Sequence, residues 1–311
     1  MEFLTKTNID FLGKRKVAFA ISGLLILATI IALIINGGPL LNIDFKGGQI
    51  IEVGFGREVS VAKARSVVEE AGVEDAEIQS IGTGKAVLFR LPADAEVEGV
   101  EDISGAIIER LREAFPETTV DLRRQELVGP KVSGELKKQA LLATLVALAG
   151  ILLYVTIRFK FRFGVGAVVA LFHDVIITVG VLTILGREIS LPVVAALLTI
   201  VGYSINDTIV ISDRIRENIR ILYREKFFDL VNRSLNQTLN RTVITSLTTL
   251  LVLLCIFFFG GTVIHDFSLT LIIGVIIGTY SSIYVVSPIV VAWEEASPKK
   301  EKKAKKERPP R

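Results

Sequence analysis

Apolar residues in this chain are gathered into long continuous runs, and polar residues are concentrated between those runs. The runs lack the periods of two or 3.6 residues that are typical of half-buried strands and amphipathic helices. A helix needs about 20 apolar residues to cross the hydrocarbon layer of a bilayer, so the pattern predicts a polytopic α-helical membrane protein. Six segments are long enough to be transmembrane helices: residues 17–35, 139–157, 164–185, 189–211, 243–259 and 267–293.

Residues 36–138, between the first two segments, form the only stretch of the sequence that is large enough for a soluble domain. Hydrophobic spacing, with Ser60 as an expected helix N-cap and Gly72 and Pro116 as expected stops, predicts six elements in it. Their order is typical of the ferredoxin-like, split βαβ type of α+β domain. The elements are a strand at 41–55 interrupted by Gly47-Gly48, a helix at 61–71, a hairpin of strands 76–81 and 85–91, a helix at 100–115 and a strand at 118–127.

Lysine and arginine residues indicate how the six segments are oriented. They are frequent in residues 1–16 and 294–311 and in the loops after the second and fourth segments, whereas the two short loops of the opposite side hold only Arg187. Basic loops remain in the cytoplasm. The sequence therefore predicts a multi-pass protein of the cytoplasmic membrane with both termini in the cytoplasm. Residues 17–35 would be the first transmembrane helix, 36–138 an extracytoplasmic domain and 139–293 helices two to six.

The tail at residues 294–311 is expected to be disordered, because it is strongly basic and has almost no large apolar residue. It is suited to bind anionic lipid headgroups. A role in fixing the topology is an equally good interpretation, and contact with RNA is a weaker one, so no nucleic-acid partner is predicted.

Asp207 stands inside the fourth apolar segment, beside Asn206. A charge near the middle of a membrane helix costs about 3 kcal/mol on insertion scales, so such a residue usually faces the protein interior and a partner. Two other ionisable residues, His173 and Asp174, lie near the centre of the third segment, and Arg241 stands just before the fifth. Asp207 is therefore the first candidate for a functional residue.

Two polar stripes predict that the fourth and fifth segments face each other. At 100° per residue, Thr199, Tyr203, Asn206 and Asp207 share one face of the fourth segment. A second stripe runs into the fifth segment, and together the two stripes predict a polar seam between two helices. The second stripe consists of Thr238, Arg241, Thr242, Thr245, Thr248 and Thr249.

Such a seam is suited to carry protons. Burial disfavours the charged form of a carboxylate and a nearby cation favours it, so an arginine that approaches or recedes can switch the protonation of Asp207. The alternative is that Asp207 and Arg241 form a static pair. For His173 and Asp174, a local hydrogen-bonded cluster and a proton relay are equally good interpretations.

Other chemistry is not indicated by the sequence. A metal site is improbable because the chain has only two histidines, and His265 lies in an outer loop. The soluble stretch has no histidine or cysteine for a nucleophile-base pair, and no phosphate-binding loop is present. We therefore expect no enzymatic activity and no cofactor, with protons as the coupling ion and sodium as an open alternative. Cys255 is expected to be a buried apolar side chain, and Gly274-x-x-x-Gly278 to be a helix-packing motif.

Five short motifs are spread over nearly the whole chain. Together they are specific, although Asn42 stands where glycine is more common, and they resemble the SecD/SecF family of protein-export membrane proteins, in particular its SecF type. The motifs are LTIVGYSINDTIVISDRIREN at 198–218, NIDFKGG at 42–48, VGPKVSGEL at 128–136, ALFHDV at 170–175 and NQTLNRT at 236–242.

The resemblance implies a bundle like that of the resistance-nodulation-division (RND) transporters. It implies that the chain pairs with a separate SecD and assists the SecYEG translocon, using the proton-motive force to draw unfolded preprotein outward. Asp207 and Arg241 would then belong to the proton path, and Asp174 less firmly. Two rival functions remain. One is a passive scaffold or holdase between the translocon and an insertase, and the other is an RND-type exporter of small molecules or lipids.

Overall fold

A computed structural model of the chain divides into two compact units. The structure describes residues 7–73, 76–81, 84–92, 95, 102–158 and 161–296. Residues 1–40 and 144–311 belong to the first unit, here called the membrane unit, and residues 41–143 form the second, here called the small unit. Apart from residues 294–296, the predicted basic tail lies outside the described residues.

Six helical segments among the described residues are long and apolar enough to cross a membrane, which confirms the predicted number. The last one contains a five-residue π-helical turn, a feature that often marks functional sites. The segments are α1 (Arg15–Ile35), α5 (Pro130–Arg158), α6 (Phe161–Ile184), α7 (Leu191–Ile221), α8 (Phe227–Phe259), and the sixth, built from α9 (Thr262–Ser281), η1 (Ser282–Val286) and α10 (Ser287–Ala296).

Three helices extend well beyond their apolar segments. α5 begins at Pro130 instead of residue 139, because proline suits the first turn of a helix. α7 continues into its charged end to Ile221, as the spacing of Ile211, Ile215 and Ile219 predicts. α8 begins at Phe227, 16 residues before the apolar run. Apolar length therefore locates a membrane span but does not fix where its helix begins or ends.

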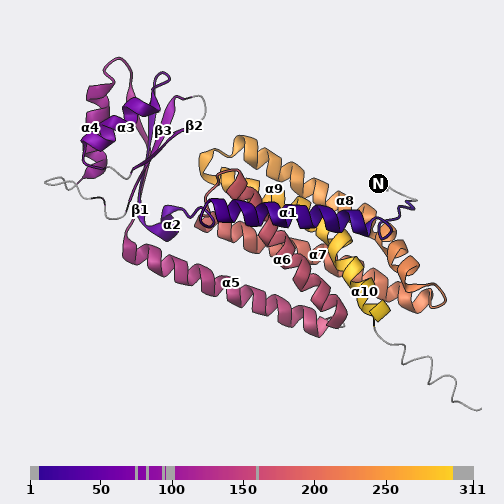
Figure 1. Ribbon diagram of the computed structural model, residues 1–311. Coiled ribbons are helices and arrows are strands. Elements are labelled where there is room, and N and C mark those ends of the chain that lie inside the picture. Colours follow the sequence, from indigo (N-terminus) through magenta and orange to yellow (C-terminus); the bar gives the residue numbers. More distant parts are fainter. Residues whose placement is uncertain are drawn as a thin grey trace, which may run out of the picture. The chain divides into compact units, whose positions relative to one another are not determined.

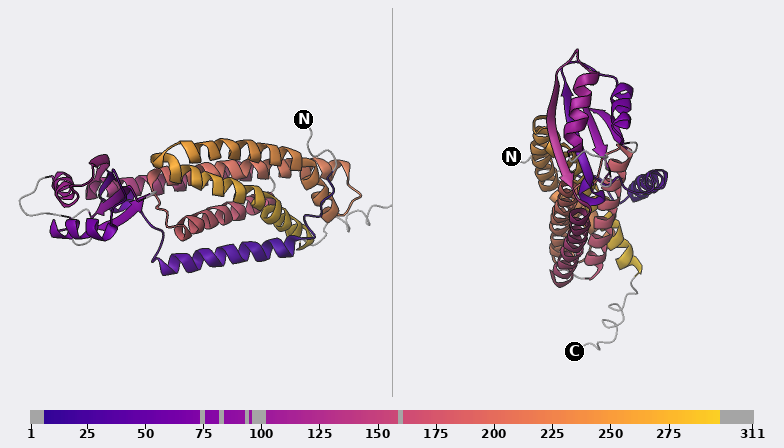
Figure 2. Two further views of the ribbon diagram at one scale, coloured as in Figure 1. Left: turned by 90° about the horizontal axis from the view of Figure 1, so that it is seen from above. Right: turned by 90° about the vertical axis from the view of Figure 1, so that its left-hand side faces the viewer.

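In the membrane unit, α7 packs against α6, α8 and α9, while α1 packs on α6. Figures 1 and 2 show α1 running along the outside of this group. Two apolar clusters fill the unit. Ile200 and Val275 belong to the one towards the start of α7, and Phe163, Ile211 and Leu235 belong to the one towards its end.

Two glycines of α9 bring that helix close to α7, which confirms the packing motif. A Cβ atom on Gly274 would lie 2.1 Å from Ile200 Cδ1, and one on Gly278 would lie 3.0 Å from Ser204 Cβ. Ile200 and Ser204 are one turn apart on α7, as the two glycines are on α9. The motif therefore serves contact within this chain.

We expect Gly274→Ala to destabilise the membrane unit by about 1–3 kcal/mol, the usual cost of an extra methyl group in a packed core. The Ile200 side chain would have to move as a whole to make room. Thermal unfolding in detergent would measure the change. Gly23→Ala in α1 is the control, because its Cβ would meet nothing within 4 Å, and it should be neutral or stabilising by up to about 1 kcal/mol. Equal melting temperatures for the two variants would contradict this account.

Cys255 is exposed on α8, so the expectation of a buried side chain was wrong. Of the residues beside Cys255 on α8, Leu253 alone is buried, and most of the others are exposed. A cysteine there faces the same apolar medium as the leucines beside it.

The small unit is a four-stranded antiparallel sheet with two longer helices. Its strand order is β2-β3-β1-β4, with Ile51 of β1 opposite Phe89 of β3 and Gln125 of β4. The order of its strands and longer helices along the chain is the predicted one. They are β1 (Gly48–Phe55), α3 (Val61–Glu70), β2 (Glu77–Ile81), β3 (Ala86–Leu91), α4 (Ile103–Ala114) and β4 (Val120–Val128).

The first predicted strand was too long. Residues Ile43–Lys46 form a single helical turn, α2, whose first residue follows Asn42. The Asn42 side chain accepts a hydrogen bond from the Asp44 backbone N–H at 3.3 Å and so caps the turn. Gly47, at φ 78°, then adopts the left-handed conformation that allows the strand to begin at Gly48.

Candidate functional site

Asp207 lies in the middle of α7. Arg214, in the charged end of the same helix, follows seven residues later, which is roughly 10 Å along the helix axis. Asp207 is 3% exposed, and within the part of the chain that the structure describes its Oδ2 atom has no hydrogen-bond partner. It shares the buried face of α7 with Ser204, Thr208 and Ile211. A buried carboxylate oxygen without a donor is costly, which makes Asp207 an unusual polar group of the bundle.

Thr242 of α8 lies near the level of Asp207. Tyr203 Oη donates to Ser246 Oγ at 3.5 Å, and Asn218 Nδ2 donates to Ser234 Oγ at 2.8 Å, so residue numbers rise along α7 as they fall along α8. Counted from these two pairs, Asp207 is level with residues 242–245 of α8. Thr242 is buried, and its Oγ1 also lacks a partner among the described residues. Two unpaired oxygens from facing helices thus lie in one seam.

Arg241 is exposed and, within the described ranges, forms no ion pair with Asp207. The structure therefore shows Asp207 and Arg241 apart, although the sequence predicts that both belong to one site. A static contact pair is not what this conformation contains.

The polar seam is narrower than the two predicted stripes. Thr199 and Asn206 are exposed on α7, while Tyr203 is half-buried. Several threonines donate to carbonyl oxygens of their own helix, which satisfies their hydroxyls locally. These are Thr199, Thr238, Thr245, Thr248 and Thr249.

Asp174 is the centre of a second polar cluster, and it is fully buried on α6. Its Oδ2 accepts hydrogen bonds from Ser204 Oγ at 2.6 Å and Ser281 Oγ at 2.8 Å. Its Oδ1 lies 3.0 Å from His173 Nδ1. In contrast with Asp207, both oxygens of this carboxyl group have partners, contributed by α6, α7 and α9.

His173 extends the cluster to α1. Its Nε2 lies 3.0 Å from Ser22 Oγ, Ser22 Oγ lies 3.1 Å from Tyr280 Oη, and Tyr280 Oη donates to Ala18 O at 2.6 Å. Tyr280 has a single hydroxyl proton, so Ser22 must donate to Tyr280, and Nε2–H must then donate to Ser22. The remaining contact, between His173 and Asp174, needs one further proton. The complete set of bonds therefore holds one proton within the His173–Asp174 pair, which is neutral overall.

Sequence reasoning found both carboxylates but not the serines that surround Asp174. Ser22, Ser204 and Ser281 are buried small residues in apolar helices, where serine usually bonds its own backbone. Only Ser204 carried a signal, since it lies inside the motif around Asp207. Ser281 directly precedes the π-helical turn, which an apolar run does not indicate.

Within the described part of the chain, no three histidine, cysteine, aspartate or glutamate side chains are grouped so that they could hold a metal ion. The two clusters therefore offer proton-binding groups: carboxylates, an imidazole and hydroxyls.

Comparison with known proteins places the chain in a family. Residues 107–296 match the C-terminal family of SecD/SecF protein export membrane proteins. A relative from Thermodesulfovibrio yellowstonii, described as protein translocase subunit SecF, is 45% identical over 94% of this chain and 96% of its own length. One from Endomicrobium trichonymphae with the same description is 42% identical over 94% of both chains.

Two solved structures are also similar. The crystal structure of SecDF from Thermus thermophilus, described as a translocon-associated membrane protein, has a TM-score of 0.83 at 42% identity. It is matched over 95% of this chain, which spans 40% of that longer one. SecDF in a super-membrane-facing form has a TM-score of 0.69 at 42% identity, over 98% of this chain and 41% of its own. The chain belongs to the SecD/SecF family of protein export membrane proteins, among the SecF subunits.

Proposed function

We propose that this chain couples the proton-motive force to the export of unfolded preproteins across the cytoplasmic membrane. Membership of the SecF subunits supports the export role. The similar SecDF structures, of which this chain spans about two fifths, support SecD as its partner. Together they would assist the SecYEG translocon, and an insertase is a further candidate partner. The chain would then be an accessory translocase subunit without an enzymatic reaction of its own.

The observation that carries the coupling is the buried, unpaired Oδ2 atom of Asp207. A structural carboxylate inside a membrane bundle is expected to have donors, as Asp174 has, whereas Asp207 Oδ2 has none among the described residues. The surroundings of such a carboxyl group stabilise neither its charged form nor its protonated form strongly. A small movement of a nearby charge therefore decides whether it holds a proton. This is the property that a coupling site needs.

Arg241 is the charge that moves in this proposal. Its guanidinium remains positive at any physiological pH. When Arg241 approaches Asp207 it favours release of the proton, and when it recedes it favours uptake. If the two events face opposite sides of the membrane, each proton delivers about 2.3 kcal/mol per 100 mV. Tyr203 of α7 and Thr238, Thr242 and Thr245 of α8 are the polar residues proposed to line the path, whereas Asn206 is exposed and lies outside it.

Asp174 enters the proposal as the second carboxylate. The chain of His173, Ser22 and Tyr280 could conduct a proton, since imidazole and hydroxyl groups both donate and accept. Its complete set of hydrogen bonds favours the other role, which is to hold α1, α6, α7 and α9 together around Asp207.

The proposal also includes the orientation. The basic connections after α5 and within α7–α8 support cytoplasmic termini, which makes the small unit extracytoplasmic. Its strand order and helix positions support a ferredoxin-like domain. The basic tail would contact anionic lipids. An exporter of small molecules or lipids is less well supported, because a single unit of about 100 residues leaves little surface for a substrate pocket.

The decisive experiment measures export of a preprotein into proteoliposomes that contain SecYEG, SecD and this chain. A pH gradient and an electrical potential would be imposed separately, with sodium present or absent. We expect stimulation by either gradient component without sodium. A passive scaffold would raise export equally with and without a gradient. If stimulation required sodium, then sodium and not the proton would be the coupling ion.

A further inference from the structure

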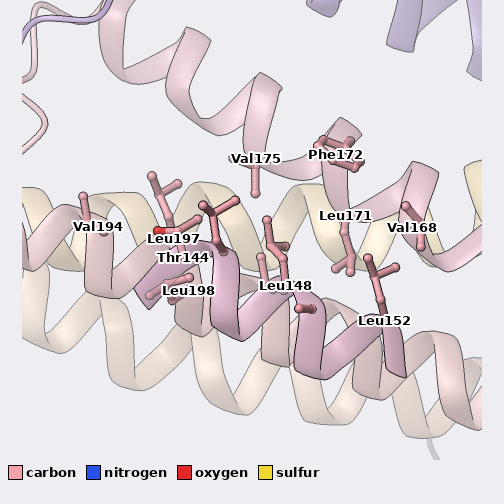
Figure 3. A pocket seen from close by; sticks show the side chains of 13 residues that line it. Thr144, Leu148, Leu152, Val168, Leu171, Phe172, Val175, Val194, Leu197 and Leu198 are labelled. Carbon is pink, nitrogen blue, oxygen red and sulfur yellow. The ribbon is translucent and has the colours of Figure 1, made fainter. Parts of the chain in front are cut away.

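An apolar cavity lies between part of α5 and the helices α6 and α7. It has a volume of about 410 Å³, within the range of small-molecule binding sites. Leu148 and Leu152 of α5 point into it from one side, and Leu171 and Val175 of α6 from the other (Figure 3). The remaining wall is α7, including Val194, Leu197, Leu198 and Val201.

A second cavity of about 200 Å³ continues the first towards the α5–α6 connection. The two share Leu152 and Val168, and the second reaches Phe161 at the start of α6. Along α5, the lining residues run from Thr144 to Val155, which is roughly 17 Å at 1.5 Å per residue. That is about half of the 30 Å hydrocarbon thickness of a bilayer, so the groove is as long as one leaflet is thick.

The lining determines what can occupy this groove. Among the described residues, Thr144 is the only polar side chain in the walls of either cavity. Cavities lined by leucine, isoleucine and phenylalanine do not hold water. Side chains of α5 do not close the gap, because Leu145 and Leu152, which line it, remain exposed. At this depth of the membrane, the groove requires a hydrocarbon chain.

Two arginines, each paired with a carboxylate, stand at one end of the groove. Arg158 closes α5 three residues after Val155, with its Nη2 atom 3.0 Å from Asp213 Oδ2 and its side chain 43% exposed. Arg162 follows at the start of α6, where it pairs with Glu294. An exposed guanidinium can add a phosphate oxygen to its contacts. The charge therefore favours an occupant that has an apolar chain and an anionic head.

We propose that the groove binds one acyl chain of a phospholipid from the leaflet on the side of the α5–α6 connection, with its phosphate beside Arg158. The lipid fills the space between α5 and the pair α6 and α7, and it can leave the bundle. α5 follows the last strand of the small unit, β4, after the single residue Gly129. Lipid binding would thus regulate how firmly the helix that leads from the small unit is held.

The test uses the full chain together with SecD, purified in detergent and analysed by native mass spectrometry. Phosphatidylglycerol is added after annular lipid has been stripped. We expect one phospholipid to remain bound to the wild type. Ala149→Phe places a ring in the groove and should weaken retention about tenfold. Gly150→Phe is the control, since a side chain there meets nothing within 4 Å, and it should retain the lipid.

A second measurement does not depend on how the variants fold. A phosphatidylglycerol with a diazirine on its acyl chain should crosslink in the wild type to peptides containing Leu148, Leu171 or Leu197.

Arg158→Gln should reduce retention of phosphatidylglycerol more than that of phosphatidylcholine. Equal retention by Ala149→Phe and Gly150→Phe would overturn the proposal. So would crosslinks that vanish when SecD is present, which would identify a partner helix as the occupant.

Discussion

Asp207→Asn is expected to reduce export to the level measured without a gradient, while the chain inserts and assembles normally. Asparagine has nearly the same shape but binds no proton, so the coupling step is removed. No hydrogen bond to Oδ2 is lost, because none exists among the described residues. Removing a charge from the bundle also removes a desolvation cost. The stability should therefore change by less than about 1 kcal/mol, or increase.

Asp213→Asn is the matched control for Asp207→Asn. It is the same change on the same helix, but Asp213 is partly exposed and pairs with Arg158 and Arg216. Exposed ion pairs contribute about 0–1 kcal/mol, so this variant should keep both its stability and its response to a gradient. Both variants would be measured in proteoliposomes with SecYEG and SecD. Gradient-driven export by Asp207→Asn would remove Asp207 from the proton path.

The fold was predictable from the sequence to the extent that the bilayer imposes it. A span must be long and apolar, so six runs gave six helices. The strands and longer helices of the small unit followed from turn and cap residues such as Ser60, which accepts a hydrogen bond from the Lys63 backbone N–H. The single turn α2 was missed because its four residues are too few to establish a helical period.

The site was predictable only in part. Asp207 could be found because a carboxylate in an apolar run is costly wherever it points. The partners of a buried group depend on how the helices pack against one another. The spacing of residues within one helix does not specify that packing. The serines around Asp174 come from three other helices, and Arg241 turned out to stand apart from Asp207. Asn206, beside Asp207 in sequence, is exposed because it lies 100° around the helix.

Asp174→Ala is expected to have the opposite effect to Asp207→Asn: a large loss of stability. The substitution leaves the hydroxyls of Ser204 and Ser281 and the imidazole of His173 without their acceptor in a buried site. Removing one member of a buried, hydrogen-bonded pair typically costs about 3–5 kcal/mol. Unfolding of the purified SecD complex in detergent would show a lowered midpoint, and the contacts of α1 through Ser22 should weaken first.

Asp174→Asn separates a structural role from a proton-relay role. The asparagine carbonyl oxygen can accept from both serines, and its amide can donate to His173 Nδ1, whose Nε2–H then donates to Ser22. The amide thus reproduces the bonds of the neutral pair, and stability should stay within about 1 kcal/mol of the wild type. If Asp174 only positions the helices, this variant should export with full gradient stimulation. Loss of stimulation with retained stability would assign Asp174 to the proton path beside Asp207. A collapse of stability in Asp174→Asn would mean that the cluster requires the ionised carboxylate, and it would place the shared proton of the neutral pair on His173.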